Sequence, residues 1–589
     1  MTLLSLLNRV GAARGSQSAS HASSTIFCVR YNVNIKCRPT PVKGPQLNLN
    51  LTDTCRKYCA SASQTLHTMG SVDNPGLAGI QLPTIKLDST LTELFRRASS
   101  KNANARLGMV FCGVNSSVDL NPDFPRNTKY LYQDSPFNTV PRKELTRKNH
   151  ELKKSLAMKY LSLIPQRDAF IAGPSPVIMF NMNQSLSTVA HDREEASTTL
   201  SVLDPSQRPN LVFCPGPSKI PMKEHGIDKI TYKIVADGLE AYPLTHSLET
   251  HWILNSKAGL TRSGLPTPKC DIVSVKGYPS PDPKYCCEAC RTDKRSNDLA
   301  FIPVSCTGPR GQWLKTQSSK ILSAISSRSV PFVLKNQQVF GGAGTWIVTT
   351  QEQKDELFSD FESPDGPLRK LLSQVTPENY HMDPAAVIIS DMVSSPIGDY
   401  GLTFFVNENG GHVFLAASEQ MTDGNNAWVG STIVYSRQKA LYEKFKALIT
   451  RTAEFVSKHG YIGPVGTDVL ETKEEGETET HNGEKTRFHV VDLNVRTSGS
   501  LALPLLKGHF TERGLDCASS FGITVRGIRE EFARRWKREF EEGKMFVLSW
   551  YEDREEGSSI ADVVVGAEDE KGLGEMIERV REGSEEVVF

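Results

Sequence analysis

The chain has 589 residues, of which 38% are hydrophobic and 23% charged, and its formal net charge is +1 at pH 7. This length accommodates roughly three or four domains, and the composition is typical of a globular protein. The near-neutral charge gives no reason to expect nucleic acid or an anionic membrane as the main partner, and no apolar run reaches the roughly 18 residues that would predict a transmembrane helix.

The first 50 residues contain basic residues and many serines, and no acidic residue precedes Asp53. This composition is typical of a transit peptide, although a disordered segment or a gene-model extension explains it equally well. We therefore expect residues 1–70 to be a disordered or targeting-like extension. The expected location is cytoplasmic, and mitochondrial if the basic segment is a transit peptide.

Short apolar runs bounded by turn residues occur at 107–112, 177–180 and 211–214. Such runs are typical of buried strands in an α/β layer. Between the first two, the charged segment 142–163 has helix-forming composition. Residues 71–248 are accordingly predicted to form an N-terminal α/β domain.

One cluster stands out among the twelve cysteines, which otherwise mostly lie apart and do not indicate a disulfide-rich secreted domain. Cys286, Cys287 and Cys290 are followed by Cys306, and these thiolates would suffice for a structural zinc site with tetrahedral geometry. Paired CxxC units at zinc-finger spacing are missing, so reduced cysteines in an ordinary loop are the alternative.

A lysine stands beside a glycine-rich loop between two apolar segments. Residues 333–334 and 346–348 are rich in β-forming residues and predict two short strands, with Lys335 leaving the first. Glycines would let backbone amides approach phosphate oxygens, and the lysine would supply positive charge. The spacing is not that of a Walker A loop, so an ordinary glycine turn is the alternative to a nucleotide phosphate site. The loop glycines concerned are Gly341, Gly342 and Gly344.

Polar and apolar residues alternate from His489 to Arg496, which predicts a strand. A second strand at 464–470 would place Asp468 opposite its polar face, with the hydrophilic segment 471–487 as an exposed hairpin connection. Two carboxylates and an amide oxygen would suit Mg²⁺, or Mn²⁺, whereas a polar outer face on an ordinary hairpin is the alternative. The predicted polar face consists of Asp492, Asn494 and Arg496, and the apolar face of Val491, Leu493 and Val495.

Between these motifs and the C-terminus, residues 438–459 carry apolar side chains at helical spacing and predict an amphipathic helix. After Gly522 the pattern predicts a charged helix over 527–543, strands over 545–551 and 560–565, and a helix over 571–582. This alternation indicates a small C-terminal α/β appendage over 516–589.

Taken in order, the lysine strand, the glycine loop, the apolar strand 386–393, Asp468 and the Asp492-x-Asn494-x-Arg496 strand resemble an ATP-grasp enzyme. The resemblance implies a multidomain α/β and α+β protein, in which the N-terminal domain precedes an ATP-grasp domain over 249–515. That domain would have two lobes that hold ATP between them, with the hinge near 388–393.

The resemblance also implies roles for single residues. The segment 249–268 is similar to the family's lysine-bearing helix and the Gly-Leu-Pro passage after it, so Lys257 would be a second phosphate ligand beside Lys335. Asp391 would contact the ribose, with the backbone at Met392 and Val393 beside the adenine. The family more often has glutamate near this hinge, so Asp399 is an alternative ribose contact.

The implied reaction activates a substrate carboxylate as an acylphosphate and couples it to an amine, or to a thiol, forming ADP and phosphate. Asp468, Asp492 and Asn494 would hold the Mg²⁺, although the family usually shows Glu-x-Asn where this chain has Asp492-x-Asn494. Lys257, Lys335 and Arg496 would oppose the developing negative charge, Arg496 through its planar fork.

The expected partners of such an enzyme are ATP, a small carboxylic acid and an amine, without nucleic acid or membrane; an assembly of identical chains is left open. Another ATP-grasp phosphoryl transfer, by a kinase or a carboxyphosphate-forming enzyme, is the nearest alternative. An ATP-binding regulatory or scaffold protein without turnover is a further one.

Overall fold

The computed structural model describes residues 79–586 except for 114–119, 121–122, 135–146, 182–184, 281, 293–300, 341–343, 365, 423–427 and 474–485. The chain divides into two compact units, Met1–Pro75 and Gly76–Phe589. All described residues belong to the second unit, so the extension predicted at 1–70 lies outside them. Within the described ranges, no helix has the length and apolar character that a bilayer crossing requires.

The N-terminal part of this unit is a four-stranded parallel sheet with the strand order β4-β3-β1-β5. The three apolar runs became β1, β3 and β4, which confirms the predicted α/β layer, while β5 was not predicted. Apolar side chains from both faces of the sheet are buried, as is usual for parallel sheets. The strands and long helices here are β1 (Leu107–Val110), β3 (Pro176–Phe180), β4 (Asn210–Cys214), β5 (Lys229–Tyr232), α4 (Arg147–Phe170) and α5 (Leu186–Leu200).

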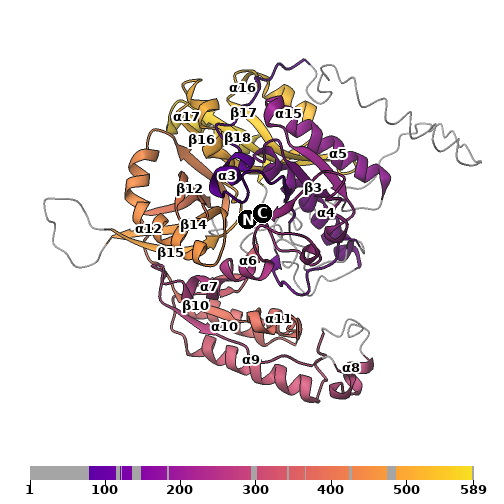
Figure 1. Cartoon of the computed structure of the whole chain (residues 1–589). Helices are drawn as coiled ribbons and strands as arrows, with labels where there is room; N and C mark the ends of the chain where they lie inside the picture. The colour runs from indigo at the N-terminus through magenta and orange to yellow at the C-terminus, as the bar shows by residue number, and fades with distance from the viewer. Residues whose placement is uncertain are drawn as a thin grey trace, which may run out of the picture. The chain divides into compact units, whose positions relative to one another are not determined.

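A smaller antiparallel sheet follows, with the strand order β6-β10-β7-β9. Three helices pack on it around one apolar cluster, and Figure 1 shows α9, α10 and α11 gathered beside β10. The two strands predicted around the glycine loop are β7 and β9. The elements are β6 (Cys270–Val273), β7 (Phe332–Asn336), β9 (Thr345–Val348), β10 (Val387–Asp391), α9 (Pro309–Ser327), α10 (Gln351–Glu362) and α11 (Pro367–Ser373). We refer to them together as the small lobe.

The largest sheet joins β15-β14-β11-β12-β13-β16-β18-β17, with β19 paired to β16. The predicted amphipathic helix is α12 (Gln438–Lys458), whose apolar side chains pack on β11 and β14. The strands are β11 (Gly398–Val406), β12 (His412–Thr422), β13 (Trp428–Val434), β14 (Gly463–Lys473), β15 (Thr486–Asn494), β16 (Cys517–Arg526), β17 (Met545–Asp553), β18 (Ser558–Ala567) and β19 (Glu585–Glu586).

The sheet runs without interruption across the boundary expected at residue 516, because β16 pairs with β13 on one side and β18 on the other. The charged helix predicted over 527–543 is in fact two helices that meet at Trp536. The indole of Trp536 is buried, and the chain leaves helical geometry there to place it. The helices of this part are α15 (Arg529–Arg535), α16 (Lys537–Glu541) and α17 (Glu570–Glu582).

The remaining short elements connect these sheets. They are α3 (Leu91–Ala98), β2 (Gln133–Asp134), α6 (Leu248–Leu254), α7 (Lys257–Arg262), α8 (Glu288–Thr292), β8 (Val339–Phe340), α13 (Ala502–Leu505) and α14 (Lys507–Thr511). Together the parts form a mixed α/β and α+β fold with several sheets, as the sequence predicts.

Candidate active site

The predicted acidic strands are β14 and β15, which pair antiparallel with Asp468 opposite Asp492. The Asn494 side chain reaches back across the pair, and its Nδ2 donates to Asp468 Oδ2 at 3.3 Å. The structure therefore brings these three residues together, with the amide nitrogen of Asn494 facing Asp468 and its amide oxygen accepting from Arg496. Both aspartates point to the same side of the strand pair because directly opposite residues in a sheet share a face.

The expected alternation along β15 is interrupted by a bulge. Val469 pairs with Val490, and Asp468 pairs with Asp492, so Val491 is an extra residue on its strand. Val490 is fully buried and takes the core position that the sequence pattern assigned to Val491, whose side chain is half-buried. The expected apolar face is therefore wrong at Val491. The bulge presents the Val491 carbonyl instead, which accepts a hydrogen bond from Lys335 Nζ at 2.8 Å.

Lys257 reaches the same place from another part of the chain. The single helix predicted from residue 249 is divided into α6 and α7, and Ser256 caps α7 by accepting a hydrogen bond from Gly259 N at 2.9 Å. Lys257 is the first residue of α7, and its Nζ lies 2.5 Å from Asp492 Oδ1. The residue is only 6% exposed, so Lys257 is not a solvated surface lysine.

Gln337, which sequence reasoning missed, fastens Lys257 to the small lobe. The backbone N–H of Lys257 donates to the Gln337 carbonyl at 3.0 Å, and Ala258 N donates to Gln337 Oε1 at 2.9 Å. Gln337 is buried and follows Lys335 by two residues. Because of these bonds, both lysines are anchored to one segment at the end of β7. The signal available in the sequence was a glutamine just beyond the strand that carries Lys335.

The electrostatics of the cluster follow from burial and proximity. Burial, and then the charges of Asp492 and Asp399, raise the pKa of Asp468 well above its ordinary value. Burial alone would also raise the pKa of Asp492, but the charges of Lys257 and Lys335 outweigh it and lower that pKa. Burial, and then the charge of Lys257, lower the pKa of Lys335. The two aspartates thus differ, one being paired with lysine and the other not.

A chain of polar side chains continues from Asp468 in both directions. Gln420 Nε2 donates to Asp468 Oδ1 at 3.1 Å, and Ser431 Oγ donates to Gln420 Oε1 at 3.3 Å. On the other side, Arg496 Nη1 donates to Asn494 Oδ1 at 2.5 Å. Gln420 on β12 and Ser431 on β13 were not identified from the sequence, because they come from strands with no distinctive motif. They fix the orientation of Asp468.

Arg496 links this cluster to the parallel sheet. Just beyond β5, Lys233 forms a buried ion pair with Asp168 at 2.6 Å, and its backbone N–H donates to Val110 at the end of β1. The pKa of Lys233 is lowered to about 8, chiefly by burial, and the charge of Arg496 makes a small contribution to this lowering. The carboxyl edge of a parallel sheet is where α/β proteins usually bind ligands. Lys233 and Asp168 were also missed from the sequence.

The nucleotide-binding residues expected from the resemblance are placed less completely. Asp391 ends β10, three residues beyond the Cα partner of Lys335, and its exposed side chain pairs with Arg328. Met392 and Val393 follow it and are half-buried. Gly344 has a φ of 72°, which favours glycine, and its carbonyl accepts from Asn336 N at 2.8 Å. Gly341 and Gly342 lie outside the described residues.

Asp399 lies nearer to the acidic pair than Asp391 does. It belongs to β11, which pairs with β14, and its charge contributes to the raised pKa of Asp468. Burial also raises the pKa of Asp399 itself. The structure therefore places the alternative ribose contact within electrostatic reach of the cluster.

Three of the four cysteines considered for zinc come together in the small lobe, with Cys287, Cys290 and Cys306 forming one group of sulfur atoms within 4.8 Å. The fourth, Cys286, is not part of that group. It is buried, and its sulfur accepts a hydrogen bond from Arg310 Nη1 at 3.5 Å. A four-cysteine site including Cys286 is therefore wrong as a ligand set.

A cavity of about 500 Å³ opens elsewhere, between α7 and α12, and its walls include Arg262, Arg451 and Lys458. None of the clustered lysines and aspartates lines it. The candidate active site is therefore identified by the convergence of the lysines and aspartates and not by this cavity.

No family model matches the chain, and no curated protein matches it. Among solved structures, it is similar to N5-carboxyaminoimidazole ribonucleotide synthetase (purK) in an ADP complex, at 11% identity and a TM-score of 0.41, over 86% of this chain and 98% of that one.

Two further structures are similar over most of their own length. The biotin carboxylase domain of Hydrogenobacter thermophilus 2-oxoglutarate carboxylase has 11% identity and a TM-score of 0.37, covering 70% of this chain and 85% of that one. Phosphoribosylamine–glycine ligase from Thermotoga maritima has 13% identity and a TM-score of 0.35, covering 64% and 92%. All three TM-scores lie below 0.5, so we base the functional assignment on this chain's own residues.

Proposed function

We propose that the protein is an ATP-dependent ligase of the ATP-grasp type, which activates a carboxylate as an acylphosphate and joins it to an amine. The observation that carries the proposal is the convergence of Lys257 and Lys335 on the β14–β15 strand pair that holds Asp468 and Asp492. Two ammonium groups, that of Lys257 buried and that of Lys335 partly buried, beside two opposed carboxylates would suit a site for Mg²⁺ and a polyphosphate.

The donor set fits a hard divalent cation. Asp468 and Asp492 face each other as like charges, and the raised pKa of Asp468 reflects both its burial and that repulsion. Asp468, Asp492 and the amide oxygen of Asn494 would hold Mg²⁺, which when bound supplies charge neutralisation for the phosphates. Asn494 Oδ1 accepts a hydrogen bond from Arg496. Asn494 therefore connects the proposed metal ligands to the arginine that is proposed to bind anions.

In the proposed reaction, the protein positions the reactants and neutralises their negative charge. A carboxylate oxygen of the substrate attacks the γ-phosphorus of ATP, the bond to ADP breaks, and an acylphosphate forms. The amine nitrogen then attacks the acyl carbon, phosphate leaves, and the amine loses a proton. Lys257 and Lys335 would bind the phosphates, while the guanidinium of Arg496 would hold the transferring phosphoryl or carboxylate oxygens.

The acyl substrate is proposed to lie between Arg496 and the carboxyl edge of the parallel sheet. Lys233 stands at that edge, and Arg496 influences its pKa. The turn Thr497–Ser500 follows Arg496, and Ser498 Oγ and Ser500 Oγ lie 3.2 Å apart, offering small polar groups beside the proposed acyl position. Asp399 and Asp391 are the two candidates for the ribose contact, and the position of Asp399 near Asp468 favours it.

The decisive experiment incubates the purified protein with Mg-ATP and a panel of carboxylic acids and amines, and measures ADP and phosphate separately. Lys335→Met removes the ammonium at similar volume. Lys276→Met, an exposed lysine in the same lobe, is the matched control. Equal amounts of ADP and phosphate, dependent on acid, amine and Lys335 but not on Lys276, would support the ligase.

The other outcomes identify the alternatives. ADP without phosphate would indicate a kinase, and turnover with bicarbonate in place of an organic acid would indicate a carboxyphosphate-forming enzyme. Mg-ATP binding without turnover under any condition would overturn the ligase and favour a regulatory nucleotide-binding protein.

A further inference from the structure

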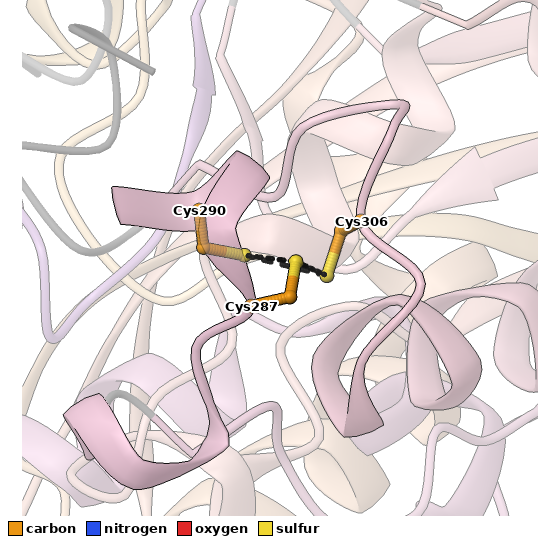
Figure 2. Close-up of side chains that lie close together, drawn as sticks. All are labelled: Cys287, Cys290 and Cys306. Carbon is orange, nitrogen blue, oxygen red and sulfur yellow. Dashed lines mark hydrogen bonds between the residues drawn. The ribbon is translucent and has the colours of Figure 1, made fainter. Parts of the chain in front are cut away.

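Three cysteine sulfurs meet in the small lobe, away from the lysine and aspartate cluster. Figure 2 shows Cys287 just before α8, Cys290 within it, and Cys306 on the loop that precedes α9, with their side chains pointing toward one another. The sulfur of Cys290 lies 3.3 Å from that of Cys306, and the sulfur of Cys287 lies 3.8 Å from Cys290 and 3.6 Å from Cys306.

These separations match the edges of a metal coordination tetrahedron. Zinc–sulfur bonds of about 2.3 Å at tetrahedral angles place the sulfurs about 3.8 Å from one another. A disulfide would need two sulfurs about 2.05 Å apart, and none of the three cysteines forms a disulfide. Three thiols that merely fill a core have no reason to direct all their sulfurs at one point, since each sulfur is a weak hydrogen-bonding group.

Backbone groups surround one of the three sulfurs. The backbone of Cys290, and further backbone groups at Thr307 and Gly308 before α9, form hydrogen bonds with the Cys287 thiol. The sulfur of Cys287 therefore lies among backbone donors at the start of a long helix. Cys290 is buried, whereas Cys287 and Cys306 are partly exposed, so an ion has a route to the sulfurs.

Space at this point is reserved by small residues. A Cβ at Gly311 would lie 1.9 Å from the Cys306 carbonyl oxygen, and a Cβ at Gly308 would lie 3.4 Å from Cys287 Cβ. The first turn of α9 can approach the cysteine loop this closely because Gly311 has no side chain. The geometry of the sulfurs is thus set by close packing of the loop against the helix.

We propose that Cys287, Cys290 and Cys306 bind one Zn²⁺ ion, with a fourth position completed by solvent or by a further donor. Each thiol releases its proton to solvent on binding, so the three thiolates more than offset the positive charge of the ion. Cys286 is excluded from the ligand set because its sulfur is engaged by Arg310. The metal would tie α8 to the start of α9 across the 16 positions that separate Cys290 from Cys306.

The proposed role is structural, and it does not depend on the ligase assignment. α9 contributes Leu314, Ile321 and Ile325 to the core of the small lobe, so fixing its first turn stabilises the helix that supports the β7 sheet. A cross-link that closes a loop stabilises mainly by restricting the unfolded chain.

The test measures zinc in the full chain, purified under reducing conditions and desalted, by elemental analysis. We expect about one zinc per chain in the wild type and in Cys286→Ser, and at least about a tenfold loss in Cys287→Ser, Cys290→Ser and Cys306→Ser. Cys286→Ser is the matched control because it changes the neighbouring buried cysteine.

Two measurements guard against misfolding as the explanation. Circular dichroism and calorimetry of each variant establish whether it is folded, and the wild type is also reconstituted with cobalt(II) after zinc removal. Intense visible absorption bands of the cobalt protein would show tetrahedral sulfur coordination. A zinc-free wild type whose cobalt form gives only the weak bands of the hydrated ion would overturn the proposal, as would a Cys286→Ser variant that loses the metal while folded.

Discussion

Both lysines of the candidate site meet at Asp492, because Lys257 pairs with its carboxylate and Lys335 bonds to the carbonyl just before it. Asp468 stands opposite without a lysine partner and has the opposite pKa displacement. Two aspartates of similar sequence context therefore have different electrostatic surroundings. The sequence pattern indicated both residues but could not distinguish them, since the difference depends on a lysine that is 235 positions away along the chain.

Asp492→Asn and Asp468→Asn are each expected to lower kcat by about 10²–10³-fold, because each removes charge that neutralises the metal and phosphates in the transition state. ATP affinity without metal should change much less. Steady-state kinetics with the substrates that the panel identifies, beside nucleotide titrations, separate the two effects. Asp355→Asn, an exposed change on α10, is the control. Full activity in either active-site variant would contradict the assignment.

Arg496→Lys is expected to lower kcat/KM by about 10–100-fold although the positive charge is kept. Lysine lacks the planar fork that holds an oxygen pair and that also donates to Asn494. The comparison is Arg496→Gln, which removes the charge as well. If the lysine variant retains wild-type activity, Arg496 acts only through its charge, and the proposed two-point contact is wrong.

Among the elements, those with regular periodicity were predictable and those with local irregularities were not. The strands β7, β14 and β15 and the helix α12 follow from alternation and helical spacing. The bulge at Val491 was missed because a period of two residues was continued through it. The break between α6 and α7 had a sequence signal, since Ser256 is a favourable N-cap residue, but the resemblance to a lysine-bearing helix led us to expect one helix.

A buried histidine pair lies at helix α6, with His251 in the helix and His246 just before it, and its behaviour with pH is predictable. The rings of His246 and His251 stack with centroids 5.3 Å apart, and burial lowers the pKa of both, that of His246 to about 3. In the unfolded chain these imidazoles titrate near 6.5, so protons bind the unfolded state preferentially below that pH. Their contribution to stability is present above about pH 6.5 and is lost as the pH falls toward the folded-state values.

His246→Phe is therefore expected to flatten the decline in unfolding free energy below pH 6.5, by up to about 1.4 kcal/mol per pH unit. Urea unfolding at pH 7 and at pH 5.5 provides the measurement. His225→Phe, at a half-buried position outside the pair, is the control and should leave the slope unchanged. Equal slopes in wild type and His246→Phe would show that the pair does not titrate on unfolding.

On the scale of the whole molecule, the expected mixed α/β architecture is observed, whereas the small C-terminal appendage over 516–589 was predicted from local patterns alone and stays a prediction. Local patterns reveal strands but not which strands become neighbours, and the pairing of β13 with β16 joins segments 87 positions apart. Phe546 and Val564 also belong to the same apolar core as Leu107 and Met109 of the parallel sheet. We propose that 516–589 is an integral part of the large sheet.

Ending the chain at residue 515 is expected to abolish cooperative unfolding, because it would expose the edge of β13 and remove the buried side chains of β16–β18. Calorimetry and solubility measurements test this. A chain beginning at Gly76, the start of the second compact unit, is the comparison and should keep its transition. A soluble 1–515 chain with an unchanged transition would show that the C-terminal part is a separable appendage.

The ion pair between Lys257 and Asp492 gives the protein a thermodynamic property beyond its chemistry. In the proposed site, phosphate binding would use Lys257 and metal binding would use Asp492, so either ligand would have to break the ion pair between them before it binds. The ligand that binds first has to break the ion pair, which costs free energy. The second ligand then binds to a side chain that is already released from the pair. We therefore expect positive cooperativity between nucleotide and metal, equal in both directions, with each raising the other's affinity by the same factor.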